Sequence, residues 1–363
     1  MTDLIQKQEG KQFLSGLDET KFISLAESLK WPPFKGKQLH SWIYKKWVST
    51  IDEITTLSIQ DRNLLKEKFE ISPLTLVEKQ ISNDKTIKYL WKLKDNTKIE
   101  SVRMFLEEHD SYSACISSQA GCAVGCPFCA TGKIGFLKNL SASEIVDQVL
   151  AIQRDTGERI DNVVFMGQGE PLLNYNEVIK AIHLIKDSVS IGARKITVST
   201  SGIVPYIKKL AEEKLQITLA VSLHAPDQNT REFLVPISKK YNIKELMESL
   251  RYYYRKTNRR ITIEYVMLED VNDQIERARE LGNLLKDLHC HINLIPYNPI
   301  ELRSENSELR TQNSHLHLER PKPARILKFK ETLEKASHKK VTVRKERGVD
   351  IKAACGQLAN ISN

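Results

Sequence analysis

The sequence predicts an α/β protein in which a parallel sheet curves into a partial (β/α)6 barrel. Short apolar runs typical of strands alternate along the chain with stretches in which apolar residues recur every three or four positions. Two further observations concern the beginning of the chain, where helical patterns come first and strand-like alternation follows. The sequence therefore predicts a small N-terminal helical domain and a β extension ahead of the barrel.

The first three helical patterns cover residues 18–31, 35–47 and 58–69, and turn-like PPF and STIDEITTL separate them. From residue 74 to residue 105 the apolar period changes to two, and KDNTK predicts a hairpin turn between strands. These changes of pattern set the expected domain boundaries. We expect a helical accessory domain at 1–72, a β extension at 73–105, the barrel at 106–345 and a C-terminal segment at 346–363.

Strand and helix patterns alternate after a cysteine-rich segment. The predicted strands cover residues 163–167, 196–200, 217–224, 261–268 and 292–298. The predicted helices cover residues 141–155, 175–187, 204–214, 243–256 and 274–288. Ser141 and Glu144 form a capping box at the start of the first helix, and a strand carrying Cys115 completes about six β/α units. Functional residues should therefore gather at the carboxyl ends of these strands.

The last part of the chain is predicted as a loop, a helix and a strand. Residues 301–326 are polar and predict a surface loop, residues 324–336 predict a helix, and residues 340–345 predict a final strand. Cys355 follows in the small-residue sequence KAACGQLAN, which leaves its sulfur unencumbered. Cys290, in contrast, is expected to be a buried structural thiol.

Composition indicates an ordinary globular protein with a basic surface. Apolar residues make up 40% of the chain and charged residues 28%, and no apolar run approaches the roughly eighteen residues that a membrane helix needs. We expect a cytoplasmic protein without a leader sequence or membrane association. The formal net charge of +9 suits a polyanionic partner such as RNA, although a soluble basic surface has the same charge.

Four of the six cysteines lie within residues 114–132, ACISSQAGCAVGCPFCATG. Such bunching favours metal binding or catalysis over a disulfide scaffold. Cys122, Cys126 and Cys129 follow a C-x3-C-x2-C spacing on a loop that two glycines and a proline make tight. Three thiolates on one loop suit a 4Fe-4S cluster that leaves one iron open to a ligand. A structural zinc site is the alternative interpretation.

Polar residues close several predicted strands on the side where a barrel places its site. Glu170 in GQGEP ends the first of these strands and offers a carboxylate to a cationic ammonium group. The other candidate residues at strand ends are Gly169, Ser199, Ser222, Leu223, His224 and Asn298. Each alone is equally typical of an ordinary hydrogen-bonded turn, but together with the cysteine loop they favour a pocket.

The cysteine loop, with Phe128 before its last cysteine, resembles the signature of the radical S-adenosylmethionine (SAM) superfamily. Over most of the chain the sequence resembles the RlmN/Cfr family of RNA adenosine methyltransferases. The matching stretches, in order, are CISSQAGCAVGCPFCATG, FMGQGEPLLN, STSGIVP, VSLHAP, REFLVPI, YVMLEDVND, HINLIPYNP and RGVDIKAACGQLA. They extend from about residue 100 to residue 360. The resemblance implies a radical SAM barrel with a 4Fe-4S cluster on Cys122, Cys126 and Cys129, and two SAM molecules consumed per turnover.

The resemblance also implies roles for the residues of the site. SAM is expected to contact Gly169, Glu170, Ser199, Ser222, Leu223, His224 and Asn298. In this family a methyl group first passes from SAM to a cysteine at the position of Cys355. A radical made from a second SAM then activates that methyl group, which adds to adenine. A cysteine at the position of Cys115 releases the product through a transient disulfide with Cys355. Glu100 matches a carboxylate assigned as proton acceptor, although alone it is typical of a surface strand.

The RlmN branch methylates carbon 2 of adenosine, whereas the Cfr branch methylates carbon 8 and confers antibiotic resistance. Pro171 and the helical N-terminal domain favour the RlmN branch, whereas Gln168 departs from the methionine that is usual there. The implied partners are 23S rRNA, certain tRNAs and a one-electron reductant such as flavodoxin or ferredoxin. A monomer is expected. Carbon 8 methylation, another radical SAM reaction with a structural Cys355, and a zinc-containing RNA-binding protein without enzymatic activity are the alternatives.

Three basic stretches are candidates for RNA contact. Residues 35–47 and 251–260 interleave Lys and Arg with Trp and Tyr, the combination that neutralises phosphates and stacks on bases. Residues 338–348 lie just before Cys355, where the substrate must arrive. Because residues 35–47 belong to the domain at 1–72, we expect that domain to bind RNA. Each stretch is also typical of a solvated helix or strand face.

Overall fold

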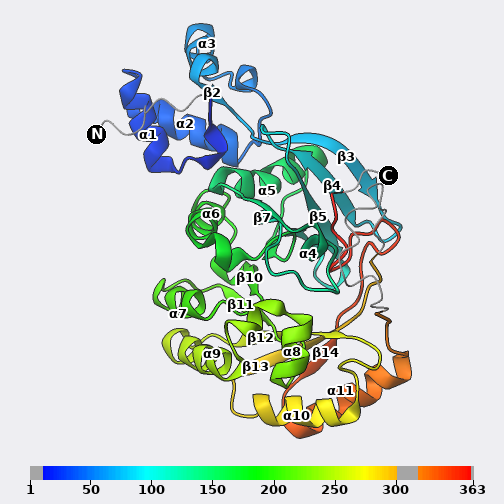
Figure 1. Cartoon of the computed structure of the whole chain (residues 1–363). Helices are drawn as coiled ribbons and strands as arrows, with labels where there is room; N and C mark the ends of the chain where they lie inside the picture. Colours follow the sequence, from blue (N-terminus) through cyan, green and yellow to red (C-terminus); the bar gives the residue numbers. More distant parts are fainter. Residues whose placement is uncertain (1–10, 301–317, 361–363) are drawn as a thin grey trace.

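The computed structural model describes residues 11–300 and 318–360 and confirms the predicted α/β class (Figure 1). A ten-stranded sheet forms its centre. Its strands, from one edge to the other, are β14 (Val341–Val343), β13 (Cys290–Pro296), β12 (Ile261–Met267), β11 (Thr218–Ser222), β10 (Ile196–Thr200), β9 (Asn162–Phe165), β6 (Ser111–Cys115), β5 (Lys98–Leu106), β4 (Ile87–Lys92) and β3 (Thr75–Ile81). The six strands β6 and β9–β13 are parallel, as predicted, and β14 adds a seventh.

Helices follow the barrel strands because each connects two parallel neighbours. The longer ones are α5 (Ala142–Thr156), α6 (Tyr175–Asp187), α7 (Val204–Glu212), α9 (Ile243–Thr257), α10 (Ile275–Leu285) and α11 (Pro323–Ser337). All six lie close to their predicted ranges. Ser141 caps α5 with Glu144, as the sequence predicts, and α5 ends at Gly157 in the left-handed conformation that favours glycine.

Several short elements escape sequence patterns because they are too short to show a period. They include α4 (Ala130–Ile134), α8 (Gln228–Leu234) and the antiparallel pair of β7 (Gln119–Gly121) and β8 (Phe136–Asn139). The 3-10 helices are η2 (Leu14–Gly16), η3 (Ile51–Glu53), η4 (Glu107–His109), η5 (Pro171–Asn174), η6 (Ala193–Lys195) and η7 (Pro236–Lys239). The β7–β8 pair encloses the cysteine loop, so this unpredicted element positions the site.

The β extension consists of β3, β4 and β5, which continue the barrel sheet as antiparallel strands. The predicted hairpin turn KDNTK joins β4 to β5. In Figure 1 these strands lie beside the C-terminal segment of the chain. The extension therefore forms the sheet edge opposite β14 and borders the segment that carries Cys355.

The N-terminal helices are α1 (Glu19–Ser28), α2 (Pro33–Tyr44) and α3 (Ile59–Lys68), and a two-stranded pair of β1 (Gln12–Phe13) and β2 (Phe69–Glu70) joins their ends. Helix α2 begins at Pro33, inside the predicted turn, because proline suits the first position of a helix. The module packs on α5, and its Phe22 and Leu39 belong to the same apolar core as Ile145 of the barrel.

The three tyrosines of residues 251–260 differ in exposure. Tyr253 of α9 is completely buried, and Tyr252 and Tyr254 pack partly buried against the core. Tyr252 also donates a hydrogen bond to Glu212 of α7. Base stacking is therefore excluded for Tyr253, because the helical period turns its face of α9 toward the sheet, whereas RNA contact by the half-exposed Tyr252 and Tyr254 stays a prediction.

Three further features complete the description of the fold. No helix in residues 11–300 and 318–360 is both long enough and apolar enough to cross a membrane. The predicted polar loop at 301–326 lies largely outside the described residues, since the structure describes only its end from residue 318 onward. Cys290 begins β13 as a buried thiol, as expected.

The close packing of α1 against α2 predicts a stability effect at Gly36. A Cβ atom there would lie 2.4 Å from the Phe22 carbonyl oxygen and 2.7 Å from Ile23 Cα. Because backbone atoms cannot yield as a side chain can, Gly36→Ala should lower the free energy of unfolding by about 1–3 kcal/mol. Urea unfolding measures the effect. Gly192→Ala is the control, since a Cβ atom at Gly192 meets no atom within 4 Å. Equal midpoints for the two variants would contradict the prediction.

Candidate active site

The cysteine loop runs from β7 to α4 and is held in shape by its own backbone. The Cys122 N–H donates to the Gly135 carbonyl at 2.8 Å, and the Cys129 N–H donates to the Cys126 carbonyl at 3.2 Å. Gly121 has φ +68°, and a Cβ atom there would lie 1.8 Å from the Gly135 oxygen. Only glycine allows this crossing, so the loop folds back on itself and turns its thiols to one side.

Cys122, Cys126 and Cys129 line one small cavity of about 180 Å³. Burial raises the pKa of Cys122 to about 12, and burial together with repulsion from the other two thiols raises the pKa of Cys126. Crowded thiols of this kind need a positive charge to become thiolates, and iron supplies it. The donor set therefore fits a 4Fe-4S cluster. In residues 11–300 and 318–360, no group of three or more His, Cys, Asp or Glu side chains is arranged to hold a metal ion.

The ends of five neighbouring strands supply the opposite wall of this small cavity. Six of the seven residues predicted to contact SAM line it: Gly169, Glu170, Ser199, Ser222, His224 and Asn298. Leu223 does not, because its side chain is buried in the apolar core. Its backbone carbonyl instead accepts a hydrogen bond from Arg231. Parallel strands thus bring together residues that lie far apart in the sequence.

Glu170 sits at the end of β9 with its carboxylate held by backbone and side-chain donors. The Ser201 N–H and hydroxyl donate to its Oε2 at 2.6 and 2.7 Å, and the Leu172 N–H donates to Oε1 at 3.0 Å. Gln119 of β7 accepts from the Glu170 N–H at 2.8 Å. Burial raises the pKa of Glu170, whereas these hydrogen bonds lower it. The carboxylate is therefore fixed in direction while Oε1 keeps room for a further donor.

His224 is a neutral ring in this cavity. Burial, with repulsion from Arg231, lowers the pKa of His224 to about 3. Its Nδ1 accepts from the Val266 N–H at 3.0 Å, so the ring proton lies on Nε2. The ring meets Phe128 of the cysteine loop edge to face, with centroids 4.9 Å apart. His224 therefore joins the strand ends to the cysteine loop.

Arg231 is a residue of the site that the sequence did not single out. Its guanidinium is buried beneath the strand ends, where it donates to the carbonyls of Ser201 at 2.6 Å and Ser222 at 2.9 Å, and also to that of Leu223. Burial lowers the pKa of Arg231 to about 10, so it remains a cation. The signal for it was its place in REFLVPI, which matched the family but suggested no role.

Two buried polar atoms in the small cavity lack partners. Asn298 Oδ1 and Glu264 Oε2 have no hydrogen bond within the described residues, although both side chains are almost completely buried. Unsatisfied acceptors of this kind are costly unless a ligand donates to them. SAM has an ammonium group, ribose hydroxyls and an adenine amino group, all of them donors. The cavity therefore fits a ligand of that chemistry.

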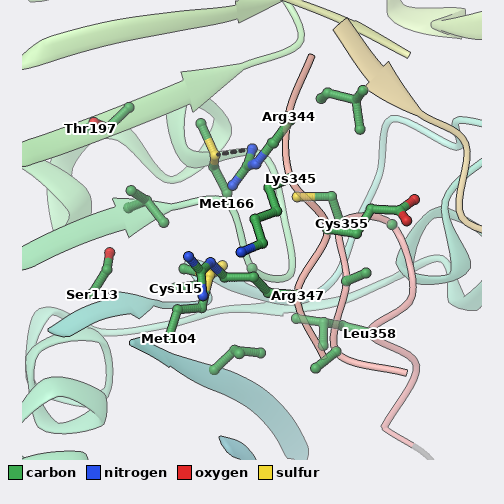
Figure 2. A pocket seen from close by; sticks show the side chains of 18 of the residues that line it. Met104, Ser113, Cys115, Met166, Thr197, Arg344, Lys345, Arg347, Cys355 and Leu358 are labelled. Carbon is green, nitrogen blue, oxygen red and sulfur yellow. Dashed lines mark hydrogen bonds between the residues drawn. The ribbon is translucent and has the colours of Figure 1, made fainter. Parts of the chain in front are cut away.

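A second cavity, of about 460 Å³, lies within the barrel beside the first (Figure 2). Cys115 at the end of β6 and Cys355 in the C-terminal segment both line it. Cys355 also lines the small cavity, together with Cys129 and Asn298. The structure thus brings the two distant cysteines to one space, and Cys355 lies on the wall that the two cavities share.

Arg344 lies between these groups and was also missed. It lines both cavities, and its guanidinium donates to the Met166 sulfur at 3.5 Å (Figure 2). Attraction to the charge of Cys355, then to those of Glu264 and Cys115, raises the pKa of Arg344, while burial opposes that rise. Arg344 therefore places a positive charge beside the space that Cys115 and Cys355 line. A basic stretch before Cys355 was predicted, but its role was assigned to RNA.

The turn that carries Cys355 docks directly on the cysteine loop. The Ala130 N–H donates to the Gly356 carbonyl at 2.7 Å, and the Thr131 hydroxyl donates to the Leu358 carbonyl at 2.8 Å. Asn298 donates to the Cys355 carbonyl at 3.3 Å. Gly356 has φ +85°, and its Cβ would lie 3.2 Å from the Phe128 oxygen. Cys355 is therefore held against the loop that carries Cys129.

Glu100 lines neither cavity. It is buried on β5, where its Oε2 accepts from the N–H groups of Ala359 at 2.7 Å and Asn360 at 2.9 Å. Lys88 lies 3.6 Å from its other oxygen. Burial raises the pKa of Glu100, against the effect of these partners. In this structure Glu100 fastens the chain that follows Cys355.

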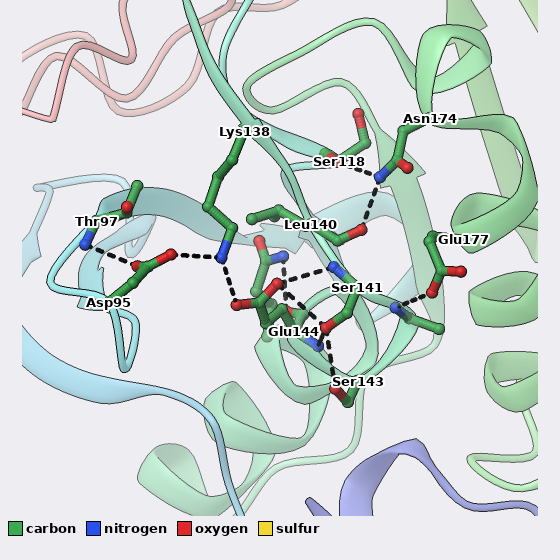
Figure 3. Close-up of polar contacts among 12 residues, drawn as sticks. Asp95, Thr97, Ser118, Lys138, Leu140, Ser141, Ser143, Glu144, Asn174 and Glu177 are labelled. Carbon is green, nitrogen blue, oxygen red and sulfur yellow. Dashed lines mark hydrogen bonds and ion pairs between the residues drawn. The ribbon is translucent and has the colours of Figure 1, made fainter. Parts of the chain in front are cut away.

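A polar network outside the cavities supports the cysteine loop (Figure 3). Asn174 donates to the carbonyls of Ser118 at 2.8 Å and Leu140 at 2.7 Å, on either side of the β7–β8 pair. Lys138 of β8 bridges Asp95 at 2.7 Å and Glu144 at 3.0 Å. The loop is thereby tied to α5 and to the hairpin turn of the β extension.

Comparison with known proteins identifies the family. The radical SAM superfamily model matches residues 116–282, and the ribosomal RNA large subunit methyltransferase N-terminal domain matches residues 12–71. The chain is 44% identical over 97% of its length to the probable dual-specificity RNA methyltransferase RlmN of Staphylococcus epidermidis, covering 96% of it. The chain belongs to the RlmN family. The RlmN protein of Alkaliphilus oremlandii is 48% identical over 90% of this chain, which covers 91% of that protein.

A solved structure agrees with this assignment. The crystal structure of a radical SAM methyltransferase from Sphaerobacter thermophilus superposes with a TM-score of 0.89 and 39% identity, covering 96% of this chain and 100% of that one. This member of the RlmN family is therefore a radical SAM RNA methyltransferase. Its cofactors are a 4Fe-4S cluster and SAM, as the sequence predicted. The zinc-protein alternative is thereby excluded.

The fixed carboxylate of Glu170 predicts a role in SAM binding. Glu170→Gln replaces the charge by an amide, so the attraction for the SAM ammonium should weaken and the Kd should rise about tenfold or more. Equilibrium dialysis of SAM with the cluster-loaded protein measures this change. Glu158→Gln alters an exposed glutamate at the protein surface and is the control. An unchanged Kd in Glu170→Gln would remove this residue from the SAM site.

Proposed function

We propose that this protein methylates carbon 2 of an adenosine of the peptidyl transferase centre in 23S rRNA, and of the adenosine 3′ of the anticodon in certain tRNAs. The observation that carries the proposal is the place of Cys355 on the wall between the two cavities. A sulfur at that place faces both the SAM pocket and the space that holds Cys115. A residue must lie here if it is to receive a methyl group from SAM on one side and pass it to adenine on the other.

The larger cavity is the proposed site of the target adenosine. Five cations line it, namely Arg194, Lys195, Arg344, Lys345 and Arg347. Positive side chains at the mouth of a cavity suit the phosphates on either side of a flipped nucleotide. The RlmN relatives are named as dual-specificity RNA methyltransferases, which supports both rRNA and tRNA as substrates.

The chemistry begins at Cys355. When bound, the cluster supplies the electron that cleaves SAM and so gives access to an otherwise unreactive carbon. Cys355 first accepts a methyl group as a sulfur nucleophile, which a thioether-forming displacement on SAM requires. Arg344 lines the same wall, and its positive charge attracts the negative charge of the attacking sulfur. Two SAM molecules are used in each turnover, one for this methyl group and one for its activation.

Cys115 completes the cycle. Activation removes one hydrogen atom from the S-methyl group of Cys355, and its carbon then joins carbon 2 of adenine. The ring proton is lost to a base and one electron would return to the bound cluster, which leaves a thioether adduct. The Cys115 thiolate then attacks the Cys355 sulfur, so a disulfide forms and the sulfur–carbon bond breaks. The electron pair of that bond passes to carbon and takes up a proton to give the methyl group. An external reductant restores both thiols.

Three residues bear on finer points of the proposal. Glu100 stays a candidate proton acceptor for the ring proton, with its nearness to the Cys355 segment as support. Pro171 supports carbon 2 rather than carbon 8, as does the RlmN name of the relatives. The unusual Gln168 donates to the Asn360 side chain at 2.7 Å, so this departure from the family pattern contacts the C-terminal segment.

The setting of the reaction is proposed from the family resemblance. We propose that the protein acts in the cytoplasm as a monomer. The electron reaches the cluster from a one-electron carrier such as flavodoxin or ferredoxin. The domain at 1–72 is proposed as an RNA-binding accessory domain, and cation–π pairs such as Lys46 over Trp42, 3.4 Å from the ring centroid, support it.

The cysteine roles predict two different failures. Cys115→Ala should load methyl on Cys355 and then remain covalently linked to RNA, because nothing attacks the adduct. Cys355→Ala should take up no methyl group and yield no product. Mass spectrometry of the Cys355 peptide and denaturing gels of protein with RNA measure both, and Cys290→Ala is the control. Clean turnover by Cys115→Ala would overturn the resolving role, and 8-methyladenosine in the product would replace the carbon 2 assignment.

The environment of Cys115 predicts a pH dependence for adduct release. Burial, with repulsion from Cys355, raises the pKa of Cys115 to about 12, while Arg344 opposes that rise. Below that pKa the thiolate fraction grows about tenfold per pH unit, so release should accelerate by about that factor per unit between pH 7 and 9. Rapid quenching of single turnovers measures the rate of release. A flat profile would show that Cys115 does not act as a thiolate in the limiting step.

A further inference from the structure

The segment that carries Cys355 is fastened on both sides to the β extension. Before Cys355, residues 348–350 contact the turn between β3 and β4 at residues 82–86. After Cys355, Ala359 and Asn360 bind Glu100 on β5, as described above. The extension is not part of the barrel, yet it holds both flanks of the cysteine.

The attachment before Cys355 consists of reciprocal hydrogen bonds between two carboxylates and their partners. The Ser82 hydroxyl donates to Asp350 Oδ1 at 2.6 Å, and the Asn83 N–H donates to Asp350 Oδ2 at 3.2 Å. In return, the Gly348 N–H donates to Asp84 Oδ2 at 2.9 Å. We call Ser82, Asp84, Gly348 and Asp350 the hairpin latch.

The backbone of the latch is built for close approach. Gly348 has φ +61°, and a Cβ atom there would lie 2.9 Å from Thr86 Cγ2 and 2.8 Å from Ala353 Cβ. A side chain would push the segment off the turn and strain the backbone. Burial opposes ionisation of Asp84, but hydrogen bonds from Thr86, Gly348 and Ser82 lower the pKa of Asp84 to about 2. The latch therefore keeps its charge at neutral pH.

The two attachments differ in exposure. Glu100 is only 1% exposed and lies with Lys88 in the interior, so its removal would leave a buried cation unpaired. Asp350, in contrast, is exposed. Replacing Asp350 therefore removes one attachment without leaving a buried charge. This difference makes the latch the attachment whose effect on Cys355 can be tested.

We propose that the hairpin latch sets the position of Cys355 on the wall between the two cavities, so that Ser82, Asp84 and Asp350 are positioning residues for methyl transfer. The inference rests on the proposed role of Cys355 as methyl carrier. A sulfur that must face SAM and then adenine has to be held within a fraction of an ångström at each stage. With the latch open, the segment before Cys355 keeps its chain connection but loses its fixed direction.

The test compares the full-length, cluster-loaded protein with Asp350→Ala, Asp84→Ala and the double variant. Asn83→Ala is the matched control, because only the backbone of Asn83 takes part in the latch. We expect Asp350→Ala to lower the single-turnover rate of RNA methylation about tenfold to a hundredfold, with the KM for RNA unchanged. Deuterium exchange of residues 346–360 should accelerate, while the unfolding midpoint stays the same. The double variant should be no slower than the slower single variant, since both open one latch.

The outcomes separate the latch from the proposed function. Wild-type rates and unchanged exchange in Asp350→Ala would overturn the latch, even where Cys355→Ala is inactive. A rate loss that appears only as a raised KM, or equally in Asn83→Ala, would also overturn it. Faster exchange and slower methylation in Asp350→Ala support it, and should Asp84→Ala fail to fold, Asp350→Ala still decides. Activity in Cys355→Ala would refute the proposed function instead, and exchange would still report on the latch.

Discussion

The site depends on how the C-terminal segment crosses the open side of the barrel. Strand β14 lies at one edge of the ten-stranded sheet and β3–β5 at the other, so the chain after β14 must pass from edge to edge to reach the β extension. On the way it bonds to Ala130 and Thr131 at the start of α4, directly after the cysteine loop. Farther along, Ala359 and Asn360 bind Glu100. These backbone contacts divide the interior of the barrel into two cavities and place Cys355 between them.

The division has an electrostatic counterpart. The interior contains Cys115 and the three thiols of the cysteine loop, and burial raises the pKa of each of the four. The buried Arg231 and the half-buried Arg344 are cations close to these thiols, and each bonds to a fixed part of the frame. Arg231 ties strand ends together beneath the SAM pocket, whereas Arg344 faces the Cys115–Cys355 pair. Each cation opposes the rise that burial causes in the pKa of one thiol, Arg231 for Cys126 and Arg344 for Cys115.

Much of this arrangement could be predicted from the sequence, and the elements that the prediction missed were missed for physical reasons. The parallel strands and their helices were predictable because buried strands are continuous apolar runs and packed helices repeat every three or four residues. Helix α8 and the β7–β8 pair are too short to show either period. Tyr253 of α9 was misassigned because a basic and aromatic composition does not reveal which face of a helix is buried. Tyr253 is buried in the core and cannot stack on an RNA base.

The sequence by itself determined the cysteine loop, because three cysteines within one tight turn can face the same way without a partner elsewhere in the chain. It also marked Cys115 and Cys355, but only through their resemblance to a family. Tertiary structure alone decided that these two share a cavity and that Leu223 and Glu100 line neither cavity. It also decided that Arg344 lines both cavities and that Arg231 ties the strand ends together. The reason is that such contacts join residues far apart in the chain. Only the closing of the sheet and the path of the segment after β14 fix those distances.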